Sequence, residues 1–555
     1  MLALGLGESA TVASAERPEA VWLANIERAR QTVRENRVGQ LVAVVSGSAN
    51  DAEYWRAHAR RVAADVFRAD GSTTVLSIHE CSPKGNLLGT LNAWRETKRS
   101  VIAREIQMPS VGLISMVFGK GKRLSPLTQS LGNCKAALPT PMTSPTSGDY
   151  LRGGDLSSLY TSTWLDTLDR AGFKGLVVKW GDEAMIPGVQ WSLPAGAYAD
   201  VDAIRFIWRT EPDEVLAREK EWVVVDEATD LMVTQYPREN LAAIQARRAE
   251  LGDRRLAMGV NLGSFAISYP LLDAALEVFD ADVGDPSRAA DWDPYGWLAL
   301  ICETDAEWEA ARAYEAKAGR PGLAGLLQHY PGFYERMREV RRRLEVRQGR
   351  PLRIAVLDFG ACFWVDMGLH QRLREALEAL TGTDTEGAVT RALFGITQQP
   401  DANGNIVVNS QVAAGANVKD SVIVDSQILD SSSVIHGGIV VGGRHRTVSM
   451  PDGGIALFCA LDSLQLDGPS SIVLRSVGAD VRLPEGGRYT VLFAPSGEVP
   501  MVGNESVTSY DGLSYDEPIL GNPLSYAEAA ALMDGVGPAE TDRAWRERWS
   551  AWPPS

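Results

Sequence analysis

A six-residue repeat between Ile406 and Gly443 places the strongest constraint on the fold. Short aliphatic segments alternate there with Asn, Asp, Ser, Gly and Gln. Two interleaved registers carry an aliphatic residue at every sixth position: Val412, Val418 and Val424 in one, and Val422, Ile428, Val434 and Val440 in the other. In a hexapeptide β-helix each beat forms one face of a triangular coil, and its aliphatic residue fills the axis. Because both registers hold over several beats, they favour a β-helix over an ordinary run of alternating strands.

The repeat also divides the chain. We expect the β-helix to occupy 396–505, with the β-rich stretch 453–503 either extending it or capping it, and a helical tail at 506–555. Domains of this kind present flat sides, so a homo-oligomer that assembles through the β-helix is one expected state.

The residues before the repeat predict an α/β domain over 1–395. A chain of 555 residues is too long for one ordinary core, since a domain averages roughly 150 residues. Apolar runs at 41–45, 73–78, 111–117 and 175–180 alternate with helix-forming segments. Such alternation indicates a doubly wound, mostly parallel sheet. Residues 198–345 combine strand pairs with Trp-rich helical segments, and we interpret them as an α+β insertion.

Composition excludes several classes of function. The formal net charge of -16 argues against general binding to nucleic acid or to an anionic membrane, because both need a broad positive field. No apolar run reaches the roughly 20 residues that span a bilayer, and no basic region precedes the apolar start. The five cysteines form no CxxC, and the six histidines form no HExxH. These patterns predict a cytoplasmic enzyme without zinc.

The segment 112–141 carries the most informative motif. A buried strand leads into a loop with two glycines, Gly119 and Gly121, and then into the start of a helix. Four basic residues lie within sixteen positions of this segment: Lys120, Lys122, Arg123 and Lys135. Glycines let backbone N–H groups approach phosphate oxygens, and the basic side chains neutralise their charge. The spacing is that of neither a Walker loop nor GxGxxG, yet it predicts a polyphosphate site.

This segment resembles the N-terminal motif of the sugar-phosphate nucleotidyltransferases (NDP-sugar pyrophosphorylases), G-G-x-G-T-R-L-x-P-L-T followed by K-P-x-L-P. The matching residues are Gly119, Gly121, Arg123, Leu124, Pro126, Leu127, Thr128, Lys135, Leu138 and Pro139. The chain departs from the motif at Phe118, where the family has a glycine, at Lys122, where it has threonine, and at Ala136, where it has proline. The resemblance extends, in patches, over about 110–445.

Further segments resemble the family in the same order. Asp182 follows the strand 175–180, where the family carries a magnesium ligand, and Asp366 in W-x-D-x-G resembles its second magnesium-binding aspartate. Asn261 and Gly263 resemble the N-x-G strand that contacts the sugar, and many members continue into a β-helix. The resemblance therefore implies a nucleotidyltransferase-type domain that binds Mg²⁺ through Asp182 and Asp366.

The implied reaction joins a nucleoside triphosphate and a sugar-1-phosphate into an NDP-sugar and releases pyrophosphate. Both substrates are anionic, so positioning and charge neutralisation carry most of the catalysis. Arg123 and Lys135 are the expected catalytic residues. The expected nucleotide-binding residues are Gly119, Lys120, Gly121, Lys122, Gly89 and Thr90.

Gly89 and Thr90 belong to a block that comes unusually early. Glu80–Trp94 resembles an acidic G-T block that family members normally reach only after the glycine-rich loop. One hypothesis is that 38–100 is a circularly permuted half of the nucleotide-binding sheet, and the alternative is an unrelated N-terminal extension. Glu80 would suit the N–H groups of guanine, while a uridine or thymidine pocket is equally open.

Two other functions compete with this one. The departures at Phe118, Lys122 and Ala136 would suit a regulatory protein that binds nucleotide sugars without turnover. His436 lies within the repeat, and some hexapeptide proteins are acyltransferases that use a histidine as base. A lone histidine in a coil is usually structural, which makes the acyltransferase the weaker alternative.

Overall fold

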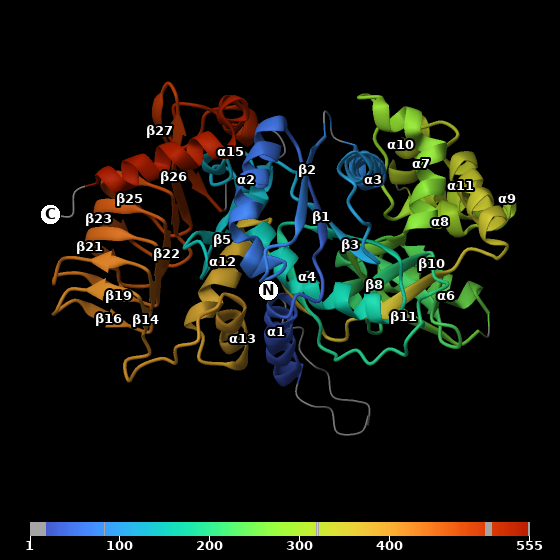
Figure 1. Ribbon diagram of the computed structural model, residues 1–555. Helices are drawn as coiled ribbons and strands as arrows, with labels where there is room; N and C mark the ends of the chain where they lie inside the picture. Colours follow the sequence, from blue (N-terminus) through green and yellow to red (C-terminus); the bar gives the residue numbers. More distant parts are fainter. Residues whose placement is uncertain are drawn as a thin grey trace.

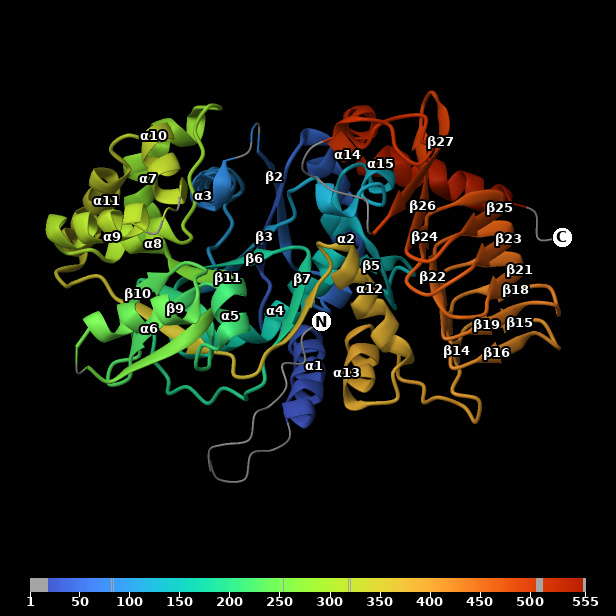
Figure 2. The ribbon, with the colours of Figure 1, turned by 180° about the vertical axis from the view of Figure 1, so that it is seen from behind.

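The computed structural model describes residues 18–552 apart from 81, 83, 253, 318, 320 and 506–512. Figures 1 and 2 show an α/β body beside a stack of short strands, with helix α15 lying along both. Among the described residues no helix is long and apolar enough to cross a membrane.

A nine-stranded mixed sheet forms the centre of the α/β body, in the order β2-β1-β3-β6-β11-β8-β12-β10-β9. Its strands are β1 (Leu41–Ser46), β2 (Thr74–His79), β3 (Val111–Met116), β6 (Gly175–Trp180), β8 (Ala203–Arg209), β9 (Trp222–Asp226), β10 (Leu231–Tyr236), β11 (Leu256–Ser268) and β12 (Ile354–Asp358). Strands β2, β1, β3 and β6 are mutually parallel. Strand β11 is antiparallel to β6 and β8, while β12 is parallel to β8. The strands between 198 and 270, expected in an insertion, thus extend this same sheet.

Helices cover both faces of the sheet because successive residues of a buried strand point to opposite sides. Val42 and Val44 of β1 pack into a core with α1 (Pro18–Arg34), α2 (Ala49–Val66) and α4 (Gly153–Arg170). Ala43 and Val45 pack on the other face against α3 (Gly85–Arg104), α7 (Tyr269–Gly284) and α11 (Phe333–Gln348). The continuous apolar run of this strand is therefore explained by burial on two sides.

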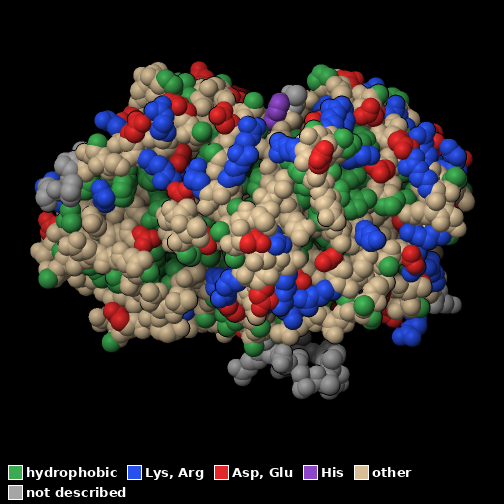
Figure 3. Space-filling view, in the orientation of Figure 1, with side chains coloured by type: hydrophobic (Ala, Val, Ile, Leu, Met, Phe, Trp, Pro, Cys, Tyr) green, Lys and Arg blue, Asp and Glu red, His purple; other side chains and the backbone are tan. Residues whose placement is uncertain are grey.

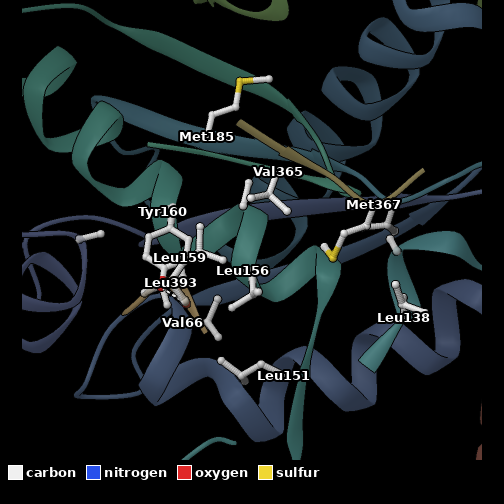
Figure 4. Close-up of a cluster of buried hydrophobic side chains, with 14 of the residues drawn as sticks. Val66, Leu138, Leu151, Leu156, Leu159, Tyr160, Met185, Val365, Met367 and Leu393 are labelled. Atoms are coloured by element: carbon white, nitrogen blue, oxygen red, sulfur yellow. Dashed lines mark hydrogen bonds between the residues drawn. The ribbon is translucent and has the colours of Figure 1, made fainter. Parts of the chain in front are cut away.

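The remaining helices and short strands surround this core. The helices are α5 (Glu214–Glu219), α6 (Leu241–Glu250), α8 (Tyr295–Ile301), α9 (Asp305–Lys317), α10 (Pro321–His329), α12 (His370–Glu378) and α13 (Thr385–Leu393). Two small antiparallel pairs complete the body: β4 (Pro139–Thr143) with β5 (Tyr150–Arg152), and β7 (Glu183–Ile186) with β13 (Phe363–Asp366). Figure 4 shows part of this core, with Leu156 of α4, Met185 of β7, Val365 of β13 and Met367 directly after β13.

Parallel strands stack coil upon coil after residue 405. One sheet contains β14 (Ile406–Val408), β17 (Val422–Val424), β20 (Gly438–Val441), β22 (Gly454–Leu457), β24 (Ile472–Leu474), β26 (Gly487–Ala494) and β27 (Gly497–Asn504). The other contains β15 (Gln411–Val412), β16 (Asn417–Lys419), β18 (Gln427–Ile428), β19 (Val434–His436), β21 (Arg444–Met450), β23 (Ala460–Leu466) and β25 (Val477–Leu483). The strands from β14 to β26 pair in parallel with strands of neighbouring coils, and β27 pairs antiparallel with β26.

The interior register of the coils differs from the strict six-residue spacing. The core between the two sheets contains Ile423 and Ile435, one position away from the expected Val422 and Val434. Val422 and Val424 instead pack into the core shared with the α/β body. The physical reason lies in the corners, where Asp420 and Asp425 adopt positive φ, because tight turns of this kind alter the number of residues per face. Among the expected interior residues, Ile428 and Val440 are buried in this core, and Val412 and Val418 pack against it.

The C-terminal segment joins the two halves of the molecule. Helix α14 (Leu513–Asp516) precedes α15 (Tyr526–Ala551), whose start is capped by Ser525 in a capping box with Glu528. Helix α15 contacts α2 in the α/β body and β26 in the coil stack. Asp542 of this helix forms ion pairs with three arginines, Arg152, Arg475 and Arg546.

We expect Asp542→Asn to loosen this junction. Burial alone would raise the pKa of Asp542, but the three arginines hold it well below its ordinary value. Removing the carboxylate leaves Arg152 and Arg475 buried without that partner, which costs about 3–5 kcal/mol. The loss should appear as a lower thermal midpoint, while the exposed Asp452→Asn changes little.

The same ion pairs of Asp542 predict that the stability of the junction depends on pH. The stabilisation is fully present above the unfolded-state pKa of roughly 3.9 and is lost as the pH falls through the lower folded pKa. The midpoint difference between wild type and Asp542→Asn should therefore shrink in acid. An equal difference at neutral and strongly acidic pH would contradict the ion-pair explanation.

Candidate active site

The glycine-rich loop after β3 closes over Lys135. Gly119 and Gly121 have φ of 110° and 62°, in a region that favours glycine. A Cβ on Gly121 would lie 2.6 Å from Thr128 Cγ2 and 2.9 Å from Lys135 Cβ, and one on Gly119 would lie 3.0 Å from Lys135 Cε. Any larger residue at these positions would push the loop away from the lysine.

Lys135 links this loop to the carboxyl end of β6. Its Nζ donates to Asp182 Oδ2 over 2.5 Å, and Asp182 directly follows the strand–Gly181 turn. The order of β3 and β6 as parallel neighbours brings the two segments to the same edge of the sheet. The loop, the lysine and the first aspartate therefore form one site.

Asp366 reaches the same point from β13. A Cβ on Gly368 would lie 2.9 Å from Asp182 Oδ2 and 3.0 Å from Asp366 Oδ1, so both carboxylates approach this one glycine. The Gly368 N–H donates to Asp366 Oδ1 over 2.7 Å, and the Met367 N–H donates to the Asp182 carbonyl oxygen. Met367 itself is buried in the core of Figure 4, which fixes the position of its neighbour.

Burial raises the pKa of Asp366, and the charge of Asp182 adds to this, although the Gly368 N–H opposes it. Two carboxylates in one half-buried place are the oxygen ligands that Mg²⁺ prefers when it also binds substrate phosphates. In the described part of the chain no group of three or more His, Cys, Asp or Glu side chains forms a metal site. The pair of aspartates nevertheless fits Mg²⁺, which usually takes one or two carboxylates plus phosphates and water.

Lys220 is a further cation of this site that the sequence motifs do not reveal. It stands between α5 and β9, and its Nζ lies 4.1 Å from the ring centroid of Trp364, two residues before Asp366. Its charge acts to lower the pKa of Asp366, while burial lowers the pKa of Lys220 itself. In the sequence Lys220 is marked only by its place two residues before the buried apolar strand β9.

A second pair of opposite charges, Lys179 and Glu183, flanks Asp182. Lys179 Nζ and Glu183 Oε2 are 3.6 Å apart on either side of Asp182 in the sequence, and Lys179 is 1% exposed. Burial lowers the pKa of this lysine and raises that of Glu183 to about 7. The Lys179 ammonium also donates to the Trp180 carbonyl oxygen, which braces the turn that carries Asp182.

The C-terminal segment holds two of the loop lysines. Lys120 forms an ion pair with Asp534 of α15, and Lys122 Nζ lies 5.0 Å from the ring centroid of Tyr515. Asn133, on the far side of the loop, also donates to Asp534. Arg123 lies exposed in the short 3₁₀ helix Lys122–Leu124 beside them. Lys120 and Lys122 thus already have partners within the protein.

Asn261 and Gly263 belong to a buried polar network beside the site. Asn261 Oδ1 accepts from Arg205 over 2.7 Å and from the Gly263 N–H over 3.0 Å. Asn261 Nδ2 donates to Glu221 and Asp293. A Cβ on Gly263 would lie 3.3 Å from Trp180 Nε1, so the network adjoins the end of β6.

Gly89 and Thr90 lie within α3 rather than in a phosphate loop. The Thr90 hydroxyl donates to the Asn86 carbonyl oxygen over 2.6 Å, and Gly89 leaves room for the Glu80 carboxylate. The hydrogen bond of the Thr90 hydroxyl thus stays within α3. Glu80 itself is 4% exposed, and its Oε1 has no hydrogen-bond partner among the described residues.

Phe118, the departure from the first glycine of the motif, packs against Trp180. Their ring centroids are 6.0 Å apart in an edge-on arrangement. The Phe118 side chain therefore packs between the glycine-rich loop and the end of β6.

No protein-family model matches the chain, and no curated protein matches it.

Proposed function

We propose that this protein is a Mg²⁺-dependent sugar-1-phosphate nucleotidyltransferase. The observation that carries the proposal is the position of Lys135, which the glycine-rich loop encloses and which bonds Asp182 where Asp366 also arrives. A cation and two carboxylates at the end of parallel strands suit two anionic substrates that must be brought together.

In the proposed reaction an oxygen of the sugar-1-phosphate attacks the α-phosphorus of a nucleoside triphosphate, and pyrophosphate leaves. The Gly119 and Gly121 segment would offer backbone N–H groups to the triphosphate, with Arg123 at its exposed side. The Lys135 ammonium would neutralise charge that develops on the α-phosphoryl oxygens, and Lys220 would face the sugar phosphate. Mg²⁺, held by Asp182 and Asp366, would supply further positive charge to the phosphates.

The strand order supports the permuted hypothesis for 38–100. Strands β1 and β2 lie beside β3 in the order β2-β1-β3-β6, parallel to the strand that feeds the glycine-rich loop. In this proposal the sheet is a nucleotidyltransferase-type sheet whose first strands come early in the chain. The coil-upon-coil parallel pairing after residue 405 likewise favours the β-helix.

An assay of pyrophosphate release tests the proposal. A panel of nucleoside triphosphates and sugar-1-phosphates is incubated with the full chain and Mg²⁺, and at least one pair should turn over. Measurable binding of an NDP-sugar without turnover of any pair would favour the regulatory protein instead. The ion pair between Asp182 and Lys135, together with the neighbouring carboxylate of Asp366, favours the enzyme over the regulatory protein.

The buried carboxylate of Glu80 predicts a preference for GTP. Its Oε1, which has no hydrogen-bond partner among the described residues, would accept from guanine, which offers two neighbouring N–H groups. Glu80→Gln should lower kcat/KM for GTP at least about tenfold, because one acceptor becomes a donor. Kinetics with GTP and UTP for wild type and variant provide the measurement, and an equal loss for both triphosphates would contradict base recognition.

The same residue gives the preference a pH dependence. Burial raises the pKa of Glu80 to about 7, so the accepting, ionised form is depleted as the pH falls below that value. The ratio of kcat/KM for GTP over UTP should therefore decrease on acidification in the wild type and stay level in Glu80→Gln.

A further inference from the structure

A groove along the free edge of the central sheet collects arginine side chains. Strand β2 is the last strand on its side of the sheet and lies between α2 and α3 (Figure 1). The groove has a volume of about 570 Å³. Its charged wall residues are Arg56 and Arg60 of α2, and Arg95, Glu96 and Arg104 of α3, with His79 at the end of β2.

Three of these arginines differ from most of the others in the protein. Arg56, Arg60 and Arg104 are exposed, and none of their side chains has an ion pair or hydrogen bond to any described residue. Arg95 has acidic neighbours in Glu96 and Asp280. Figure 3 shows Lys and Arg side chains gathered over this part of the molecule. In a chain of net charge -16, Arg56, Arg60 and Arg104 form a local positive field without an acidic partner among the described residues.

The backbone of β2 supplies a second observation. The Thr74 and Glu80 N–H groups donate to the β1 segment, at Gln40 and Ser46. Because neighbouring residues of a parallel strand direct their backbone groups to opposite sides, Val75 and Ser77 direct theirs to the open edge. No described residue bonds these two N–H groups, so the edge is available for one more strand.

The side chains of β2 do not prevent another strand from pairing with its free edge. Edge strands are commonly blunted by charged residues or proline within the strand. Here β2 reads TVLSIH, and the charges lie on the helices at either side of it. Arginines that flank an open strand attract a complementary chain instead of repelling one.

We propose that this groove binds an extended acidic segment of a partner protein, which adds to β2 as a further strand. Backbone hydrogen bonds to Val75 and Ser77 would give the added strand its register. Its successive side chains would point alternately toward the α2 and α3 sides, so carboxylates on both faces meet arginines. This interaction is separate from the nucleotidyltransferase site and does not depend on it.

The test uses the full chain and a fluorescein-labelled peptide, Glu-Glu-Val-Glu-Glu-Val-Glu-Glu, followed by fluorescence anisotropy. We expect saturable binding, and loss of binding for the same peptide with Lys in place of Glu. We also expect weaker binding, by at least about tenfold, for a peptide N-methylated at alternate residues in either register, because it cannot complete the strand ladder. Equal affinity of the methylated and unmethylated peptides would overturn strand addition.

Charge-reversal variants test whether the peptide binds in the groove or elsewhere on the surface. Arg56→Glu with Arg60→Glu should weaken peptide binding at least about tenfold. The matched control is Arg28→Glu with Arg353→Glu, two exposed arginines elsewhere that change the net charge equally. Circular dichroism shows that both variants fold. Unchanged binding in the groove variant, or binding of inorganic polyphosphate or RNA in place of the peptide, would overturn the assigned partner.

Discussion

Asp182→Asn and Asp366→Asn are each expected to lower the rate of NDP-sugar formation at least about a hundredfold while the fold is retained. Each variant keeps the size of the side chain but removes one negative oxygen of a pair that meets at Gly368. The remaining carboxylate alone would bind Mg²⁺ poorly and leave the substrate charges uncompensated. Pyrophosphate release, measured over a range of Mg²⁺ concentrations, gives both the turnover and the apparent metal affinity.

The matched control for this loss is Asp452→Asn, an exposed aspartate in the coil stack. It should leave turnover unchanged. Circular dichroism and the thermal midpoint report whether each variant is folded. Near-normal activity of both Asp182→Asn and Asp366→Asn would refute the metal assignment, and removal of divalent ions with a chelator should abolish activity of the wild type in the same assay.

Lys135→Gln is expected to have a similarly large effect on kcat. The lysine is enclosed by Gly119 and Gly121 and donates to Asp182, so no other side chain can move into its place without displacing the loop. Loss of one preorganised donor at a developing oxyanion typically costs about a hundredfold or more in kcat. The defect should lie mainly in kcat rather than in KM, because the charge that it compensates grows during the reaction.

Lys174→Gln, at an exposed lysine before β6, provides the comparison for Lys135→Gln. The double variant Lys135→Gln with Asp182→Asn gives a further check. Residues in direct contact are coupled, so the double variant should lose less than the product of the two single losses. Fully multiplicative losses would indicate that the two side chains act independently.

The arrangement of the first strands was accessible from the sequence because burial on two faces leaves a clear signature. Runs such as Leu41–Val45 contain no polar residue, and a strand with helices on both sides needs none. The glycine spacing likewise pointed to the loop, since Gly119 and Gly121 both take positive φ there. Asp182 and Asp366 were predicted from the family resemblance, and the structure brings both carboxylates close to Gly368.

Other parts of the site leave no signature in a local sequence pattern. Lys220 comes close to Trp364 and acts on Asp366 only through folding, because more than a hundred residues separate them, and its sequence neighbours do not distinguish it from a surface lysine. The contacts of Lys120 with Asp534 and of Lys122 with Tyr515 join residues that are far apart in the chain. The interior register of the coils was missed for a different reason, because turn length at each corner decides which valine faces inward.

The position of β12 has a consequence for how the chain folds. Strands β1, β2, β3 and β6 form one parallel group, and each connection between them is shorter than the stretch of chain from β8 to β12. By contrast, β12 is inserted between β8 and β10, although the residues of β9, β10, β11 and seven helices separate it from β8 in the sequence. Contacts between distant segments form slowly, since loop-closure entropy is lost before the contact stabilises the chain. The half of the sheet that carries Asn261 should therefore be the last to acquire protection from hydrogen exchange during refolding.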